Sequence, residues 1–174
     1  IFAGNLGRFQ ALEKIIDAMA LLKNRKDIKL IIVGDGSAKA DLAFKIKKTN
    51  ANVYIIDRQP AQIVKEMIKK ADFGLVSLVS NVYKYGYPGK IMTYLEQGKP
   101  IIAVLEKESE IVKLMEHENY GFCIPTSEPK KISQYLIKLL ENDLWKLKMN
   151  NNAISAYEKY FAKDKILSKW SNVL

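Results

Sequence analysis

Two basic residues on glycine-containing loops are the groups in this sequence best suited to bind an anion. Arg8 ends the loop Gly4-Asn5-Leu6-Gly7, and Lys90 follows Tyr87-Pro88-Gly89. Glycine lets the backbone approach a ligand closely, and a neighbouring guanidinium or ammonium group can bind phosphate oxygens. An ammonium group at the start of a helix is unfavourable by itself, so Lys90 indicates an anion bound there. The alternative is a pair of ordinary turns with solvated basic side chains.

A second glycine pair resembles the beginning of a dinucleotide-binding fingerprint. Gly34-Asp35-Gly36 follows an apolar run, and Asp57 stands where the ribose-binding acid of that fingerprint would be. The third glycine of the pattern is replaced by Lys39, so we predict a turn into a helix near Ser37 instead of an NAD site.

Further polar residues are candidates for nucleotide contacts. Arg58 and Gln59 follow another apolar run, and Arg58 could contact an anion or a base. Glu96 lies near the C-terminal end of a predicted helix, where the dipole disfavours a carboxylate. It is therefore expected either to be solvated or to have a partner, such as the hydroxyls of a ribose.

Cysteine and histidine chemistry is nearly absent from the sequence. A single cysteine, Cys123, and a single histidine, His117, exclude an internal disulfide and the usual four-ligand zinc site. We expect Cys123 to lie in the core and His117 on the surface, and the lack of disulfides favours a cytoplasmic compartment. We also expect no cofactor. No metal is expected either, since the sequence has no Asp-x-Asp pair.

The elements that must position these loops alternate between strands and helices. Short apolar runs predict strands, and helical apolar spacing lies between them. This alternation predicts an α/β fold, a Rossmann-like doubly wound parallel sheet of about six strands with helices on both faces. Ligands of such sheets bind at the carboxyl ends of the strands, where the candidate loops lie. The predicted strands are Ile1–Ala3, Lys29–Val33, Asn52–Ile56, Phe73–Ser77, Pro100–Val104 and Gly121–Ile124.

The chain length of 174 residues fits one domain, with a helical C-terminal extension from about residue 128. The first residues are an apolar run that leads directly into a glycine turn, as in the middle of a strand. We therefore expect residues 1–174 to be one half of a larger protein. The apolar runs are shorter than the roughly 20 residues of a membrane span.

The net charge of +9 either reflects a general bias toward lysine and asparagine or has one of three functional explanations. It could attract nucleic acid, an anionic membrane surface or a phosphate-bearing ligand. The lysines are scattered singly or in pairs and no RNP motif or arginine-rich arm is present, so nucleic acid is not the expected partner.

Taken together, the motifs resemble the nucleotide-binding C-terminal half of a GT-B glycosyltransferase of the group-1 (family-4) retaining kind. The resemblance covers essentially the whole chain. Within the family, the sequence looks most like the enzymes that build O-antigen, capsule and related bacterial surface polysaccharides. It is carried by Gly4–Leu12 with Asp17-Ala18, Ile32–Gly36, Ala71–Val76, Tyr87–Ile91, Tyr94–Ala103, Ser109-Glu110 and Gly121–Ile124.

This resemblance implies roles for the candidate residues. Arg8 and Lys90 would stabilise the donor diphosphate as leaving group, without a metal; the loop from Arg58 to Pro60 would bind the base, and the helix from Thr93 to Glu96 the ribose. The implied substrate-binding set is Gly4, Asn5, Gly7, Gln10, Gly34, Arg58, Gln59, Tyr87, Pro88, Gly89, Thr93 and Glu96.

The sequence departs from the family pattern at three positions. Many members carry two glutamates flanking the donor loop, and those places are Tyr85 and Thr93 here. Where many members have a phosphate-binding lysine, this chain has Gln10. The subgroup that this sequence resembles most also tends to have glutamine there. Glu96 is therefore a possible substitute for ribose recognition.

The function that the resemblance implies is transfer of a sugar, with retention, from a nucleoside-diphosphate sugar, UDP being the expected nucleotide. The acceptor would be a glycan or a lipid-linked molecule, bound by an N-terminal domain outside this chain. The fragment alone would bind the donor without turning it over. Attachment to the inner face of the cytoplasmic membrane would fit the positive charge. The alternatives are an NDP-sugar 2-epimerase of the same architecture and a basic nucleic-acid-binding domain.

Overall fold

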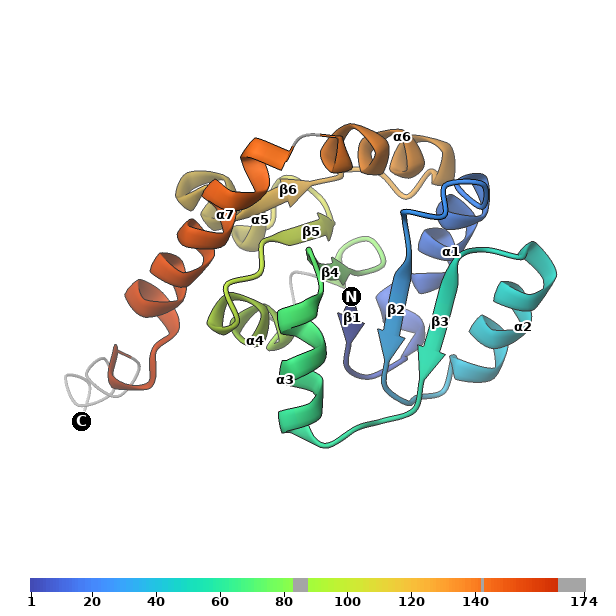
Figure 1. Ribbon diagram of the computed structural model, residues 1–174, viewed down its shortest axis with the longest axis horizontal. Coiled ribbons are helices and arrows are strands. Elements are labelled where there is room, and N and C mark those ends of the chain that lie inside the picture. The colour runs from blue at the N-terminus through green and yellow to red at the C-terminus, as the bar shows by residue number, and fades with distance from the viewer. Residues whose placement is uncertain (83–87, 142, 166–174) are drawn as a thin grey trace.

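The computed structural model describes residues 1–82, 88–141 and 143–165 (Figure 1). Parallel strands alternate with helices along the chain, as the sequence predicts. The strands are β1 (Phe2–Ala3), β2 (Leu30–Val33), β3 (Val53–Ile56), β4 (Gly74–Ser77), β5 (Ile101–Val104) and β6 (Gly121–Cys123). The helices are α1 (Leu12–Leu21), α2 (Lys39–Thr49), α3 (Ala61–Lys70), α4 (Lys90–Glu96), α5 (Glu110–Glu118), α6 (Pro129–Leu140) and α7 (Asp143–Ala156).

The six predicted strands form two three-stranded parallel sheets. The first has the order β1-β2-β3 and the second the order β4-β5-β6. In the first, Ala3 pairs with Val33 and Val33 with Ile56; in the second, Gly74 pairs with Ile101. All pairs are parallel, so the carboxyl ends of the strands of each sheet share one edge.

The two sheets meet at β1 and β4, where a buried tyrosine interrupts the pairing. At the amino end, Ile1 donates to the Phe73 carbonyl (2.8 Å) and Leu75 donates to the Ile1 carbonyl (2.7 Å). Further along, the hydroxyl of Tyr94 accepts from the Ala3 N–H (2.9 Å) and donates to the Leu75 carbonyl (3.4 Å). Beyond Ile1, the Tyr94 hydroxyl thus takes the place of direct main-chain pairing and keeps the Ala3 N–H and the Leu75 carbonyl hydrogen-bonded.

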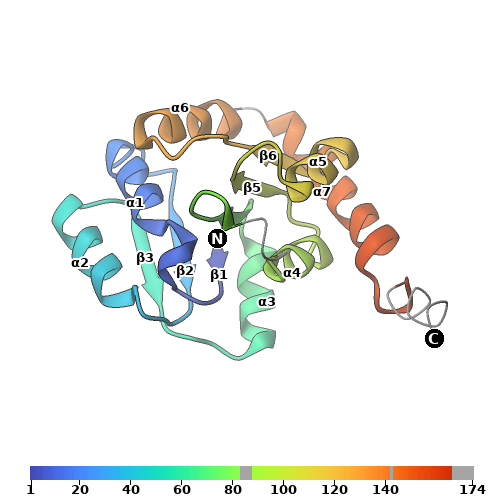
Figure 2. The same cartoon turned by 180° about the vertical axis from the view of Figure 1, so that it is seen from behind.

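Helices cover both faces of the sheets, and Figures 1 and 2 show the two sides. On one face, α1, α2 and α6 bury a core that includes Phe2, Ile32 and Ile102. On the other face, α3, α4, α5 and α7 bury a core that includes Ala3 and Ile101. Adjacent residues of one strand therefore enter opposite cores, as the period of two requires. Both cores contain residues of both sheets.

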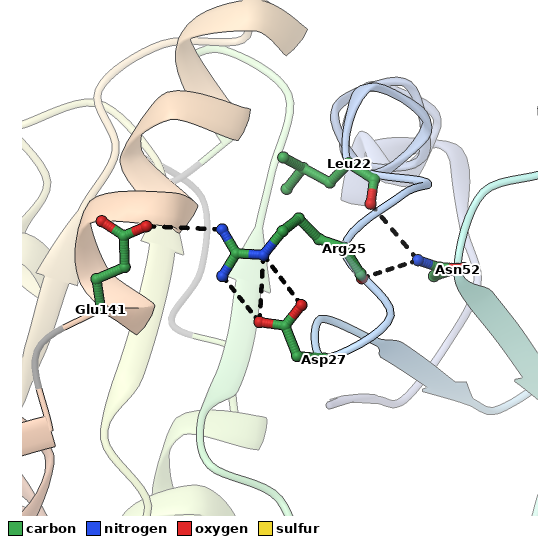
Figure 3. Close-up of polar contacts among 5 residues, drawn as sticks. All are labelled: Leu22, Arg25, Asp27, Asn52 and Glu141. Carbon is green, nitrogen blue, oxygen red and sulfur yellow. Dashed lines mark hydrogen bonds and ion pairs between the residues drawn. The ribbon is translucent and has the colours of Figure 1, made fainter.

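A polar cluster fixes the chain between α1 and β2 (Figure 3). The amide of Asn52 donates to the carbonyls of Leu22 (3.5 Å) and Arg25 (3.1 Å) beyond the end of α1. The guanidinium of Arg25 binds both carboxylate oxygens of Asp27, with an Nη2 to Oδ2 distance of 2.8 Å, and lies 3.6 Å from Glu141. Asn52 therefore satisfies carbonyl groups that a helix end leaves without intrahelical partners.

The predicted helical extension packs on the domain itself. Ile132, Leu136 and Leu139 of α6 join the same core as α1, and Ala153 and Ala156 of α7 join the core of α4. A π-helical turn at Tyr157–Phe161 follows α7. Within the described ranges, no helix combines the length and apolar character needed to span a bilayer.

Candidate functional site

The loops after β1 and β2 interlock closely at the carboxyl edge of the first sheet. Gly4 donates to the Val33 carbonyl (2.9 Å), and Leu6 donates to the Asp35 carbonyl (2.8 Å). Gly34 has a φ of +154°, and a Cβ there would lie 1.9 Å from the Gly4 carbonyl oxygen. Glycine at position 34 is thus required by backbone contact, which supports the turn interpretation of the second glycine pair over a dinucleotide fingerprint.

These loops form one wall of a cavity of about 540 Å³. The opposite wall comes from α3 and α4, and the loop after β3 closes one end. The cavity combines main-chain groups of the glycine loops with a few charged side chains. Its lining residues are Ala3, Gly4, Asn5, Val33, Gly34, Asp35, Arg58, Gln59, Ala61, Val64, Lys65, Ile68, Lys90, Thr93 and Tyr94.

Lys90 is the most perturbed charged group of this cavity. Its ammonium group donates to Oε1 of Gln10 (2.6 Å) and lies 3.6 Å from the centre of the Phe2 ring. Burial lowers the pKa of Lys90 to about 7. The ammonium group therefore contacts a neutral amide and an aromatic face, neither of which supplies a negative charge. A half-buried cation with neutral contacts is arranged to receive an anion.

The end of the cavity near β3 is bordered by an ion-pair chain. The ammonium of Lys39 lies 3.4 Å from Asp35 and 2.8 Å from Asp57. The pKa of Asp35 is lowered, chiefly because its carboxylate accepts the Gly36 N–H. Asp57 thus binds a lysine in this structure. Arg58 is exposed at the same end, beside Gln59, and both line the cavity.

The wall formed by α3 and α4 contains an ion pair between helices. Lys65 on α3 lines the cavity, and its ammonium lies 2.8 Å from Glu96 on α4. The sequence predicts that Glu96 is either solvated or paired. It is paired, and its partner is Lys65. Thr93, one turn earlier on α4, lines the cavity. Glu96 is not among the described residues that line it.

Sequence reasoning missed Lys65 and the face of α3 around it. Ala61, Val64, Lys65 and Ile68 all line the cavity. Their spacing of three, four and seven residues places them on one helical face. That periodic stripe with a single lysine was the signal available in the sequence, but it is also typical of a helix that only packs on a core.

The structure separates the predicted site residues into two groups. Seven predicted residues line the cavity: Gly4, Asn5, Gly34, Arg58, Gln59, Lys90 and Thr93. Outside the described lining lie Gly7, Arg8, Gln10, Pro88, Gly89 and Glu96. Arg8 is exposed on the 3-10 turn Arg8–Gln10, and Gln10 reaches the site through Lys90. Tyr87 and Tyr85 fall outside the described residues.

Another cavity, of about 400 Å³, lies at the amino ends of β2 and β4. Ile1, Met19, Phe73, Leu136 and other largely apolar residues line it. Parallel α/β sheets bind their ligands at the opposite ends of the strands. The cavity at the carboxyl ends, with its glycine loops and Lys90, is therefore the candidate site.

The arrangement suits recognition of an anionic ligand that also carries polar groups. Lys90 offers a donor on the α4 wall, and Arg58 and Gln59 offer donors and an acceptor after β3. Thr93 adds a hydroxyl on the α4 wall. Such fixed donors stabilise negative charge in a partly enclosed site.

Comparison with known proteins agrees with this architecture. The chain is 30% identical over 145 residues to the probable glycosyltransferase WbjE of Pseudomonas aeruginosa, covering 82% of this chain and 36% of WbjE. Its fold is similar to HepE of Anabaena in complex with UDP and glucose (TM-score 0.81, 18% identity, 99% of this chain, 47% of HepE). It is also similar to the C-terminal domain of a group 1 glycosyltransferase, LpcC, from Francisella tularensis (TM-score 0.74, 13% identity, 92% of this chain, 85% of that chain).

The chain thus spans about one third to one half of the length of the curated relatives it matches. The two structural likenesses, both below 25% identity, show a shared fold. A family model described as "Glycosyl transferases group 1" matches residues 1–142, which is most of the chain. The chain therefore belongs to the group 1 glycosyltransferase family.

Proposed function

We propose that this chain is the donor-nucleotide-binding lobe of a retaining glycosyltransferase that uses a UDP-sugar. The observation that carries the proposal is Lys90, a half-buried ammonium that contacts Gln10 and Phe2 on the wall of a cavity of about 540 Å³ beside the glycine loops. HepE, whose fold is similar, has been crystallised with UDP and glucose. Membership in the family supplies the reaction class.

In this proposal Lys90 binds the donor diphosphate. Glycosyl transfer develops negative charge on the departing nucleoside diphosphate, and a fixed ammonium stabilises that charge more in the transition state than in the bound donor. Main-chain groups of Gly4 and Gly34 line the same part of the cavity. Arg8 lies on the following 3-10 turn and acts on the same diphosphate from the exposed side.

The nucleoside would occupy the cavity between the loop after β3 and α4. Arg58 and Gln59 would contact the base, and Thr93 would contact the ribose; all three line the cavity. The ribose role predicted for Glu96 becomes indirect, because Glu96 holds the cavity-lining ammonium of Lys65 at 2.8 Å. Lys65 can donate to a hydroxyl oxygen while it stays paired with Glu96.

The acceptor is proposed to be a glycan or lipid-linked molecule of surface-polysaccharide biosynthesis, bound by a partner domain on the exposed side of this site. We place the enzyme at the inner face of the cytoplasmic membrane. A net charge of +9 favours an anionic surface. On α2, Phe44 is 70% exposed, and Lys47 and Lys48 are exposed on the same helical face.

Vesicle sedimentation tests the membrane proposal. The chain should sediment with vesicles that contain an anionic phospholipid and not with neutral vesicles, since each basic residue near the surface contributes about 1 kcal/mol. The double variant Phe44→Ser, Lys47→Glu should reduce this binding. Equal binding to neutral and anionic vesicles, or none to either, would contradict it.

Calorimetric titration with UDP tests the donor site. Lys90→Met should weaken binding by about 10-fold to 100-fold, because a charged hydrogen bond contributes about 1.5–3 kcal/mol. Lys131→Met is the matched control, since Lys131 pairs with Glu128 on the surface at α6 and its loss changes the net charge equally. If both variants bind UDP as the wild type does, the site assignment is wrong.

A further inference from the structure

Gln10 stands in direct contact with the cation of the candidate donor site. Its Oε1 accepts from the Lys90 ammonium at 2.6 Å, across 80 positions of sequence. Both side chains are half-buried. Among the described residues, Lys90 lines the cavity and Gln10 does not. The Gln10 amide can therefore influence a ligand in the cavity only through its contact with Lys90.

The surroundings of Lys90 leave this contact as its main polar anchor. The ring of Phe2 lies below the ammonium, with the centroid 3.6 Å from Nζ, and Phe2 itself is fully buried. Gly4 lies alongside, and a Cβ there would come within 3.5 Å of Cε of Lys90. The lysine side chain is thus confined between an aromatic face and a glycine loop, and the Gln10 oxygen fixes where its ammonium points.

The other titratable groups facing the cavity are engaged with partners of their own or are cationic. Asp35, after β2, accepts from Gly36 and pairs with Lys39. Lys65 on α3 pairs with Glu96. Arg58 after β3 is exposed, and the Tyr94 hydroxyl on α4 bridges Ala3 and Leu75. A neutral acceptor at Gln10 stabilises the ammonium without cancelling the charge that would bind an anion.

We propose that Gln10 is a positioning residue that holds the Lys90 ammonium group in the candidate donor site, and does not itself contact the donor. The proposal rests on the proposed function for the identity of the anion. A neutral amide thus holds one cation in place.

The test combines two readouts on the 174-residue chain. Carbon-13 NMR of the lysine Cε gives the titration midpoint of Lys90, assigned by its loss in Lys90→Met. Calorimetry gives the affinity for UDP-glucose, whose diphosphate diester does not titrate near neutral pH. In the wild type, affinity should fall as the pH rises through the Lys90 midpoint, because only the ammonium form binds the anion.

The variant Gln10→Leu should move the Lys90 midpoint down by about one unit, since the charged form loses an acceptor. UDP-glucose affinity should then fall about tenfold at about pH 8.5 and by less than about twofold at about pH 5.5, where Lys90 is protonated in both proteins. Gln62→Leu, an exposed glutamine on α3, is the matched control and should change neither readout.

The variant Gln10→Glu separates positioning from charge. Its carboxylate should raise the Lys90 midpoint and weaken UDP-glucose binding at about pH 5.5, where Lys90 is protonated in both proteins, because the carboxylate competes with the diphosphate for the ammonium. An unmoved midpoint in Gln10→Leu, with equal weakening at both pH values, would overturn the proposal and make Gln10 a direct donor contact. If the wild type binds no UDP-glucose, the proposed function fails, and the Lys90 midpoint in Gln10→Leu alone decides the positioning role.

Discussion

At the residue scale, two glycines of the site region differ in what their missing side chain allows. Gly34 lies against the Gly4 carbonyl, where a Cβ would approach to 1.9 Å with φ at +154°. Gly89, before α4, has ordinary helical dihedrals, and nothing lies within 4 Å of its hypothetical Cβ. The contact between two loops therefore requires glycine at position 34, whereas a side chain at position 89 would find open space.

Replacing these glycines should therefore have opposite effects on stability. Gly34→Ala should lower the free energy of unfolding by about 1–3 kcal/mol, because the two loops must separate. Gly89→Ala should change it by less than about 1 kcal/mol and toward greater stability. Urea denaturation of both variants checks this. Equal destabilisation by the two substitutions would contradict the loop packing described here.

A second residue-scale prediction concerns Glu118 at the end of α5. Its carboxylate accepts from Lys159 (2.8 Å) and from the hydroxyl of Tyr160, and these contacts lower its pKa from 4.5 to about 2. Because the folded-state pKa lies below the ordinary value, the carboxylate stabilises the fold above about pH 4.5. That contribution is lost as the pH falls from about 4.5 to about 2.

Glu118→Gln should lower the free energy of unfolding at neutral pH by about 1–2 kcal/mol and flatten its dependence on pH between pH 4.5 and pH 2. Glu110→Gln is the control, because its exposed pair with Lys113 on the same helix contributes little. Chemical denaturation across this pH range gives both quantities. An unchanged pH dependence in Glu118→Gln would show that other groups carry the acid sensitivity.

At the scale of elements, α4 connects the two sheets through one side chain. The Tyr94 hydroxyl bonds Ala3 of β1 and Leu75 of β4, and the ring is fully buried. A Cβ on Gly74 would lie 2.3 Å from this ring. Burial raises the pKa of the Tyr94 hydroxyl, so it stays protonated and can donate at any ordinary pH.

Tyr94→Phe should therefore lower the free energy of unfolding by about 1–3 kcal/mol, since the Ala3 N–H loses its partner in a buried place. Tyr135→Phe on α6 is the matched control, with a side chain 42% exposed. Thermal unfolding followed by circular dichroism measures both. A Tyr94→Phe variant as stable as the wild type would mean that water or a main-chain shift replaces the hydroxyl.

The elements themselves were largely predictable from sequence, because each strand is an apolar run between helical patterns. The predicted Asn52–Ile56 and Phe73–Ser77 differ from β3 and β4 by one residue. The division into two sheets was not predictable. It depends on the Tyr94 side chain entering between β1 and β4, and Tyr94 has the same apolar spacing as its buried neighbours Ile91 and Leu95.

The sequence indicated which loops form the candidate site, but not which side chains pair with each other there. Gly4, Gly34 and Lys90, which the loop patterns singled out, line one cavity. The partners of Lys90 and Glu96 come from elements 80 and 31 positions away. Such contacts depend on how helices are placed on the sheet, which local patterns do not specify.

At the scale of the whole molecule, the two sheets are expected to unfold as one cooperative unit. Each hydrophobic core crosses the junction: Phe2 and Ile102 share one, and Ala3 and Ile101 share the other. The candidate cavity also crosses it, since Gly34 follows β2 of the first sheet and Lys90 belongs to α4, which packs on the second. A ligand in this cavity would contact both halves.

Bound UDP should therefore stabilise both sheets by the same amount. At a concentration about 100 times its dissociation constant, UDP should add about 2.7 kcal/mol to the free energy of unfolding. Amide hydrogen exchange should slow to a similar degree in β2, near the cavity, and in β5, which does not line it in the described structure. Lys90→Met at the same UDP concentration is the control, and its weaker binding should reduce the slowing to about tenfold or less in both strands. Slowing confined to β2 would mean that the sheets open independently and that the Tyr94 junction is the boundary between two folding units.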